Sequence, residues 1–324
     1  MDNKTIKRVL LIAAAVFWVC IIGVYAIAYQ QFRYTPYWII MIAVFAVGAV
    51  FCLCQYRGIK KGRNNLLYTL FYMVNNYMYL LKQLVSRDFK IKYKRSYLGI
   101  VWSLLNPLLT MSVQYIVFST IFRADIENYP AYLLTGIVFF NFFNEAATLG
   151  MSSIVGNAAL IKKVYMPKYI YPVSKVISTS VNLLLSFIPL FLLMAFTGTR
   201  FTPALFLLIF DVACLLMFVV GLALLLSTAM TFFQDTGFLW GIIAMIWQYL
   251  TPVFYPISII PEKILPIYKL NPMCQFISFA RTCIIDGVSP NPKAYFLCLA
   301  SALLMLGVGM LVFRKQQNKF VLYV

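Results

Sequence analysis

The distribution of apolar residues along the chain predicts a bundle of membrane-spanning helices. A helix needs about 20 mostly apolar residues to cross the hydrocarbon core of a bilayer. Eight segments meet this requirement and place both termini on the same side of the membrane: Val9–Tyr29, Pro36–Cys54, Leu98–Phe122, Ala131–Ile154, Val176–Phe196, Ala204–Thr231, Phe238–Tyr255 and Ala294–Phe313. The predicted fold class is an all-α integral membrane protein, in keeping with a chain that is 63% hydrophobic and only 11% charged.

The first apolar segment has a second interpretation. Basic residues precede it, and the small residues Ala26 and Ala28 stand near its end, as in a cleaved signal peptide. Its apolar run is long for a signal peptide, so a retained span is the prediction and cleavage of residues 1–28 is the alternative. The rest of the topology is the same in either case.

The stretch Leu66–Val85 is apolar enough to suggest a further span, but its pattern predicts an interfacial helix. Apolar residues recur at helical spacing on one face, while Asn75, Asn76 and Lys82 lie on the other. A helix of this kind lies along the membrane surface with its tyrosines at the level of the lipid headgroups.

The segment Pro256–Pro292 is too long for a turn and too often interrupted by proline for a span. Two short apolar pieces remain in it, Ile257–Leu270 and Met273–Ile285. They predict short helices that dip into the outer leaflet and return, because irregular backbone at that depth must be shielded by protein. A proline-rich surface loop is the alternative.

The chain carries 27 basic and 9 acidic residues, a net charge of +18. The positive-inside rule explains this excess without nucleic acid if the N-terminus is cytoplasmic. Most basic residues then lie on the inner side, and the outer side keeps Arg33, Arg123, Arg200, Lys263, Lys269, Arg281 and Lys293. The basic residues just before the third span mark the cytoplasmic membrane face most clearly: Arg87, Lys90, Lys92, Lys94 and Arg95.

Neither enzymatic catalysis nor a metal site is indicated by the residue types. The chain has no histidine, which removes the usual proton shuttle and the commonest metal ligand. No GxxxxGK[ST] phosphate-binding loop is present, so ATP is not bound by that route. The seven cysteines form no zinc-binding pattern. A disulfide between Cys274 and Cys283 and two free thiols both remain open.

Two acids and several aromatic residues are candidates for a substrate path. Glu145 and Asp211 lie inside predicted spans, where a carboxylate must face a cavity, a partner or the bundle interior. Structural hydrogen bonding is the alternative for both. Aromatic residues near Trp102 and in the run Phe139–Phe143 either pack in the core or stack on the apolar faces of sugar rings.

The inner loop Gly156–Pro172 mixes basic residues with apolar ones and is punctuated by prolines. A brief helix presenting such a mixed surface is suited to docking a soluble partner. A positive-inside loop with interfacial aromatic residues is the alternative.

Five blocks follow one another between Leu84 and Arg314: LVSRDFKIKYKRSYLGIVWSLLNPLL from Leu84, NAALIKKVYMPKYIYPVSKV from Asn157, TFFQDTGFL from Thr231, YLTPVFYPISIIPE from Tyr249 and NPMCQFISFARTCIIDGVSP from Asn271. Taken together, and in this order, they resemble the permease subunits of ABC-2-type exporters. The resemblance is to the branch that moves lipid-linked polysaccharides such as O-antigen or teichoic acid. Each block alone is weak, but the set is specific.

The resemblance implies a six-span core of the type V exporter kind, an interfacial helix before it and re-entrant helices before the last span. It also implies a homodimer served by two separate ABC ATPase subunits. ATP and Mg²⁺ would be bound by those subunits, and this chain would hold no cofactor. By position, the resemblance assigns ATPase coupling to Leu160, Ile161, Lys162, Lys163, Val164, Tyr165 and Met166, and it makes Arg87–Tyr97 the gate region near the lipid pyrophosphate.

The chain departs from this family at two places. Gln234 stands where the family more usually has the arginine of an FRD motif, which leaves Asp235 without its customary neighbour. The hairpin Val9–Cys54 is additional to the six-span pattern. The predicted domains are a hairpin with a basic linker (1–64), interface and gate helices (65–97), the ABC-2 transmembrane domain (98–314) and a cytoplasmic tail (315–324).

These observations lead to one functional hypothesis. The chain would be a permease in the bacterial inner membrane that passes an undecaprenyl-linked glycan outward. Its substrate-binding and gate residues would be Arg87, Lys90, Lys94, Arg95, Trp102, Glu145 and Asp211. Three alternatives remain: an exporter of drugs or small lipids, a polyprenyl-phosphate transferase, which would need clustered acids or histidines, and an ion channel, which would need a polar filter.

Overall fold

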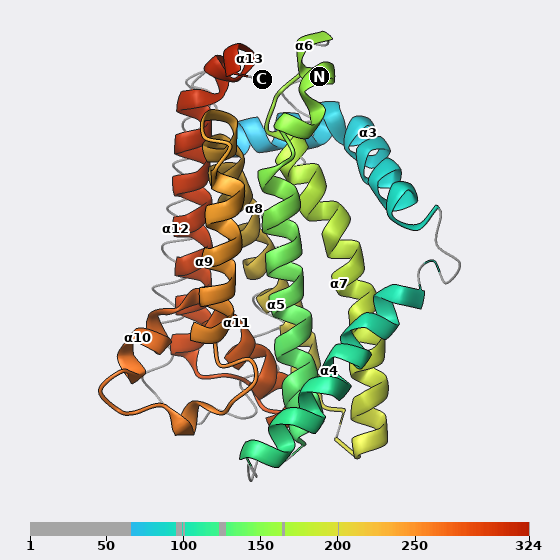
Figure 1. The fold of residues 1–324 in the computed structure, drawn as a ribbon, viewed down its shortest axis with the longest axis vertical. Coiled ribbons are helices and arrows are strands. Elements are labelled where there is room, and N and C mark those ends of the chain that lie inside the picture. Colours follow the sequence, from blue (N-terminus) through green and yellow to red (C-terminus); the bar gives the residue numbers. More distant parts are fainter. Residues whose placement is uncertain are drawn as a thin grey trace, which may run out of the picture. The chain divides into compact units, whose positions relative to one another are not determined.

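The computed structural model describes residues 66–94, 99, 101–122, 128–163, 166–199 and 201–323, and the regular elements within them are all helical (Figure 1). Leu81–Val324 forms one compact unit. The predicted spans Val9–Tyr29 and Pro36–Cys54 lie outside the described residues, as does the question of cleavage after residue 28. So do three predicted site residues: Arg95, Val164 and Tyr165.

The predicted interfacial helix is α3, which extends further than the sequence pattern indicated. It runs over Leu66–Tyr93 without a break and so includes much of the basic stretch. Within its second half Leu84 is buried, whereas Lys82, Gln83 and Lys90 are exposed, which confirms an amphipathic helix there. Basic residues in its last turn also interact favourably with the partial negative charge at a helix C-terminus.

Five of the predicted spans form helical segments that are long and apolar enough to cross a membrane. They are α4 (Val101–Phe122), α5 (Tyr129–Met151), α7 (Ile170–Thr197), α8 (Leu208–Phe232, preceded by η2, Pro203–Leu207) and α12 (Pro292–Gln316). α7 begins six residues before its predicted start at Val176. Pro172 does not prevent this, because the first turn of a helix needs no intrahelical N–H donors.

The remaining predicted span, Phe238–Tyr255, is shorter than expected. Its helix α9 covers Thr236–Leu250, which is 15 residues or about 22 Å at 1.5 Å per residue, against a hydrocarbon core of about 30 Å. The helix stops there because the ring of a proline clashes with the residue before it and makes helical backbone angles unfavourable for that residue. Thr251, which precedes Pro252, is accordingly extended, with φ −101° and ψ 128°.

α8 and α12 pack closely against each other along their length. Their backbones meet at two glycines: a Cβ added to Gly309 would collide with the carbonyl of Gly221, and a Cβ added to Gly221 would collide with the backbone at Met305. Small residues at such crossings allow membrane helices to approach closely without a hydrophobic driving force.

The two ends of this unit carry different short helices (Figure 1). One end has η1 (Val155–Asn157), α6 (Ala158–Lys163), η5 (Gln317–Lys319) and α13 (Phe320–Tyr323). The other end has η3 (Ile257–Ile259), α10 (Leu265–Leu270), α11 (Pro272–Arg281) and the π-helical turn η4 (Thr282–Asp286). The prediction of short helices between Pro256 and Pro292 is thus confirmed.

α11 is a packed element rather than part of a surface loop. Its buried face includes Met273, Phe276 and Phe279, and it lies against α5, α8 and α12. Cys274 and Cys283 are both buried and both free, so the disulfide considered above is not formed.

Exposed cations gather at the α6 end of the unit: Lys162, Lys163, Arg314, Lys315 and Lys319. At the α11 end the exposed basic residues of described side chains are Lys263 and Lys293. Arg281, counted above among the outer charges, is instead buried, with 6% of its surface exposed. The charge asymmetry of the folded unit is consistent with a cytoplasmic α6 end.

Candidate substrate cavity and coupling end

A cavity of about 240 Å³ lies among the C-terminal turn of α3 and the helices α4, α5 and α7. Its lining combines amide and hydroxyl side chains with one tryptophan and one ion pair: Lys92, Tyr93, Trp102, Ser103, Asn106, Pro107, Val138, Asn141, Phe142, Glu145, Thr179, Asn182, Leu183 and Ser186. Three asparagines on three different membrane helices are costly in a bilayer unless they face a cavity or each other. The arrangement therefore points to a binding or passage site.

Tyr93 joins three of the helices around this cavity. Its hydroxyl lies 2.6 Å from that of Ser103 on α4 and donates a hydrogen bond of 2.8 Å to Oδ1 of Asn182 on α7. Phe89, one turn earlier on α3, packs against the tyrosine ring in a tilted arrangement, with the ring centres 4.8 Å apart. The end of α3 is thus fixed to the spans by polar contacts that sequence reasoning did not identify.

Glu145 has a basic partner that is distant in sequence. Lys92 Nζ lies 2.6 Å from Glu145 Oε1, which links α3 to α5. Both side chains are partly exposed, at 44% and 36%. The sequence placed Lys92 at the cytoplasmic boundary and Glu145 inside a span, so it gave no signal of their pairing.

The predicted pyrophosphate-binding cations have different surroundings. Arg87 pairs with Asp88 at 3.2 Å and donates to Asn157 Oδ1 on η1, while Asp88 also pairs with Lys175 of α7 at 2.8 Å. By contrast, the side chains of Lys90 and Lys94 are exposed and make no ion pair or hydrogen bond within the described residues. Arg87 therefore helps to anchor α3, and the two lysines are left available to an anion.

The aromatic candidates separate into two groups. Trp102, at the start of α4, lines the cavity and is 48% exposed. The run Phe139–Phe143 is mostly core: its four phenylalanines are each no more than 2% exposed, and only Asn141 among them is exposed. Of the predicted aromatic positions, Trp102 alone is both exposed and part of the cavity wall.

Asp211 lies apart from this cavity. It is fully buried in the first turn of α8, at the α11 end of the unit. Its carboxylate oxygens make no hydrogen bond with the described residues. The structure therefore does not bring Asp211 together with the other predicted substrate residues.

Arg281 fastens the short helices at the α11 end to the bundle. Its guanidinium donates to the carbonyl oxygens of Tyr132, Pro252 and Val253 at 2.7–3.3 Å. It also lies 3.3 Å from the centre of the Tyr132 ring, a close cation–π contact. Gly136 makes room for it, since an added Cβ there would lie 2.8 Å from Arg281 Nη2.

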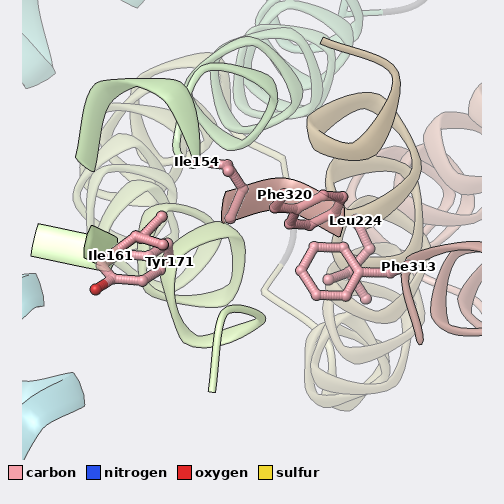
Figure 2. Packing of buried hydrophobic residues seen from close by; sticks show 6 residues of the cluster. All are labelled: Ile154, Ile161, Tyr171, Leu224, Phe313 and Phe320. Atoms are coloured by element: carbon pink, nitrogen blue, oxygen red, sulfur yellow. The ribbon is translucent and has the colours of Figure 1, made fainter. Parts of the chain in front are cut away.

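The predicted coupling helix is α6, and part of its surface faces its own chain. Ile161 is buried beside Tyr171, in a cluster that also contains Ile154, Leu224, Phe313 and Phe320 (Figure 2). Leu160 and Met166 pack against the same cluster. Ile161 is therefore not available as a surface contact. The exposed residues of α6 are Ala159, Lys162 and Lys163.

The C-terminal segment completes this cluster. Phe320 of α13 is fully buried and packs against Phe313 and Phe232 at ring-centre distances of 5.2 and 5.9 Å. Lys168, in the loop after α6, donates to the carbonyl of Gln317 at 2.6 Å and lies 5.8 Å from the Phe320 ring. Partial burial lowers the pKa of Lys168. The region predicted as a cytoplasmic tail therefore braces the base of the loop that contains α6.

A model of the ABC-2 type transporter family matches residues 79–285, which include α3 from its midpoint, the cavity and α6. Two O-antigen export system permease proteins RfbA of Klebsiella pneumoniae are 31% and 29% identical over 74% of this chain and 93% of their own length. The polysialic acid transport protein KpsM of Escherichia coli is 20% identical over 72% of this chain and 92% of its length. With five helices long and apolar enough to cross a membrane and a family match over most of its length, this chain belongs to the ABC-2 type transporter family.

Proposed function

We propose that this chain is the permease subunit of an ATP-driven exporter of lipid-linked polysaccharide in a bacterial inner membrane. The chain matches O-antigen permeases over 93% of their length and, more distantly, a capsule export protein over 86% of its length. The latter is named a capsule polysaccharide export inner-membrane protein, of Neisseria meningitidis. The chain is a transport component and not the catalytic subunit.

One structural observation supports a lipid-linked glycan as the substrate. The basic end of α3 lies directly beside a polar cavity between membrane helices. A lipid-linked glycan has an anionic pyrophosphate joined to a sugar, and these two surfaces offer cations and hydrogen-bonding groups side by side. Exposed Lys90 and Lys94 would attract the pyrophosphate at the cytoplasmic membrane face.

The energy for transport would come from two ATPase subunits docked at the α6 end. Two copies of this chain would then enclose the path, with both termini in the cytoplasm. The exposed lysines of α6 and the neighbouring residues Val164 and Tyr165 would contact the ATPase. Residues 65–97 would act as interface and gate helices, and residues 98–314 as the transport domain.

Charge reversal at the two exposed lysines tests this proposal. Lys90→Glu combined with Lys94→Glu should abolish surface display of the glycan, since the site would then repel the pyrophosphate. Membrane insertion and co-purification of the ATPase should be unchanged. Lys263→Glu combined with Lys293→Glu is the matched control, because both lysines are exposed at the opposite end. Normal display in the Lys90/Lys94 variant would reject the assigned role.

A further inference from the structure

We propose that the cavity among α3, α4, α5 and α7 binds the carrier-proximal sugar ring as an uncharged unit, while the pyrophosphate stays outside it at Lys90 and Lys94. This inference rests on the proposed function, because it identifies which part of the substrate the cavity accepts. It makes the cavity a carbohydrate site and separates it from the phosphate site.

The size of the cavity suits a single sugar. Pockets for drug-sized ligands begin at about 300 Å³, and this cavity has a volume of about 240 Å³. A multi-sugar segment would not fit into it as a whole. The cavity would therefore hold one ring at a time beside the end of α3.

The lining offers both kinds of contact that a pyranose needs. Trp102 presents a half-exposed indole face, on which the apolar C–H face of a sugar ring can pack. Asn141 has no hydrogen-bond partner within the described residues, so its carbonyl and amide groups are both available for hydroxyls. Asn182 accepts from Tyr93 through Oδ1, which leaves its NH₂ group to donate.

The charge in the cavity argues against phosphate as the occupant. Its lining contains one cation, Lys92, and that ammonium lies 2.6 Å from the carboxylate of Glu145. An anion entering the cavity would meet a neutralised lysine and a nearby carboxylate, and it would lose hydration without gaining an unpaired cation. A neutral sugar loses far less hydration energy and finds hydrogen-bond partners.

Two probes distinguish sugar recognition from carrier recognition. The complete complex of this chain with its ATPase, in lipid nanodiscs, is titrated with farnesyl diphosphate bearing one N-acetylglucosamine and with plain farnesyl diphosphate. The sugar-bearing probe should bind about tenfold more tightly, as expected for one or two additional hydrogen bonds in a desolvated site.

Cavity variants should remove this difference. Trp102→Ala and Asn141→Leu should lower the affinity for the sugar-bearing probe to that of plain farnesyl diphosphate, whose own affinity should not change. Asn141→Ser, which keeps a hydroxyl, should retain part of the preference. Leu109→Ala is the matched control, since Leu109 is two helical turns along the same face of α4, exposed, and outside the cavity.

The outcomes separate this inference from the proposed function. Equal binding of both probes to the native complex, or an unchanged preference in Trp102→Ala and Asn141→Leu, would overturn the sugar site while glycan export by the chain still stood. Normal surface glycan in cells lacking the chain would refute the proposed function and the inference together.

Discussion

At the scale of single residues, two charged side chains inside the bundle have partners that are far away in the chain. Glu145 is paired with Lys92, and Arg281 is held by carbonyl groups of α5 and of the turn after α9. Spacing along one helix could not show these contacts, because each joins separate helices. Depth in the membrane singled out Glu145 as a residue that needs a partner, but Asp211 makes no hydrogen bond with the described residues, and Arg281 had been placed among the outer charges.

Arg281 provides the first residue-scale prediction. Replacing it with methionine should lower the midpoint of thermal unfolding strongly, since three carbonyl groups would lose a charged donor, and hydrogen bonds to charged groups contribute about 1.5–3 kcal/mol each. Arg281→Lys should be intermediate, because a single ammonium cannot reproduce the planar fork. Midpoints are measured by size-exclusion chromatography of heated, detergent-solubilised protein.

Lys293→Met is the control for this series, because Lys293 is exposed and contributes only its backbone N–H to a helix cap. An Arg281→Met variant as heat-stable as the native protein would show that α11 is held in place by its apolar face alone.

At the scale of helices, the apolar pattern predicted which elements exist more reliably than where they end. α4, α5, α7, α8 and α12 correspond to predicted spans, but α9 stops at Leu250, where the residue before Pro252 turns extended. α3 continues to Tyr93 because Lys90 and Lys92 favour a helix C-terminus. Apolar counting could detect neither effect, since both depend on backbone geometry and local electrostatics.

The role of the C-terminal helix was missed for a different reason. Residues 315–324 are too few and too polar to read as a span, so the sequence suggested a tail. Phe320 nevertheless fills a gap between α8, α12 and the coupling loop (Figure 2). A single buried aromatic residue produces no periodic pattern, and only the packing reveals it.

This packing leads to an element-scale prediction. Phe320→Ala should release the segment from Gln317 onward, because removal of a buried phenylalanine costs about 3–5 kcal/mol. Opening of the segment should then be at least about a hundredfold more frequent, and trypsin should cleave faster at Lys315 and Lys319. Loss of the brace beneath α6 should also reduce glycan export.

The control for that variant lies two residues away. Leu322→Ala should leave both trypsin cleavage and export unchanged, because Leu322 is 82% exposed. Equal cleavage of the Phe320→Ala and native proteins would mean that the cluster does not hold the C-terminal segment in place.

At the scale of the whole molecule, three features lie at different positions along one bundle. The predicted coupling helix α6 and the short helix α11 lie at opposite ends (Figure 1). The cavity lies where the end of α3 meets α4, α5 and α7, and Arg281 secures the short helices at the α11 end. The family match covers all three positions. A signal from an ATPase at α6 would reach the cavity through α7, because Tyr171 of α7 lies in the cluster with Ile161 and Asn182 of α7 lines the cavity.

The orientation of this arrangement in the membrane is the prediction on which the functional scheme depends. Exposed cations are concentrated at the α6 end, so the positive-inside rule places that end in the cytoplasm.

Cysteines introduced at Lys163 and Lys293 report on the two ends, after Cys20, Cys52 and Cys54 are replaced by serine. The four cysteines of the described residues are buried and can stay. In intact spheroplasts, a membrane-impermeant maleimide should label Lys293→Cys at once and Lys163→Cys only after permeabilisation. The reverse pattern would put the α6 surface outside the cell, beyond the reach of any cytoplasmic ATPase. It would also put the lysines of α3 on the outer face of the membrane, where they could not receive a substrate made in the cytoplasm.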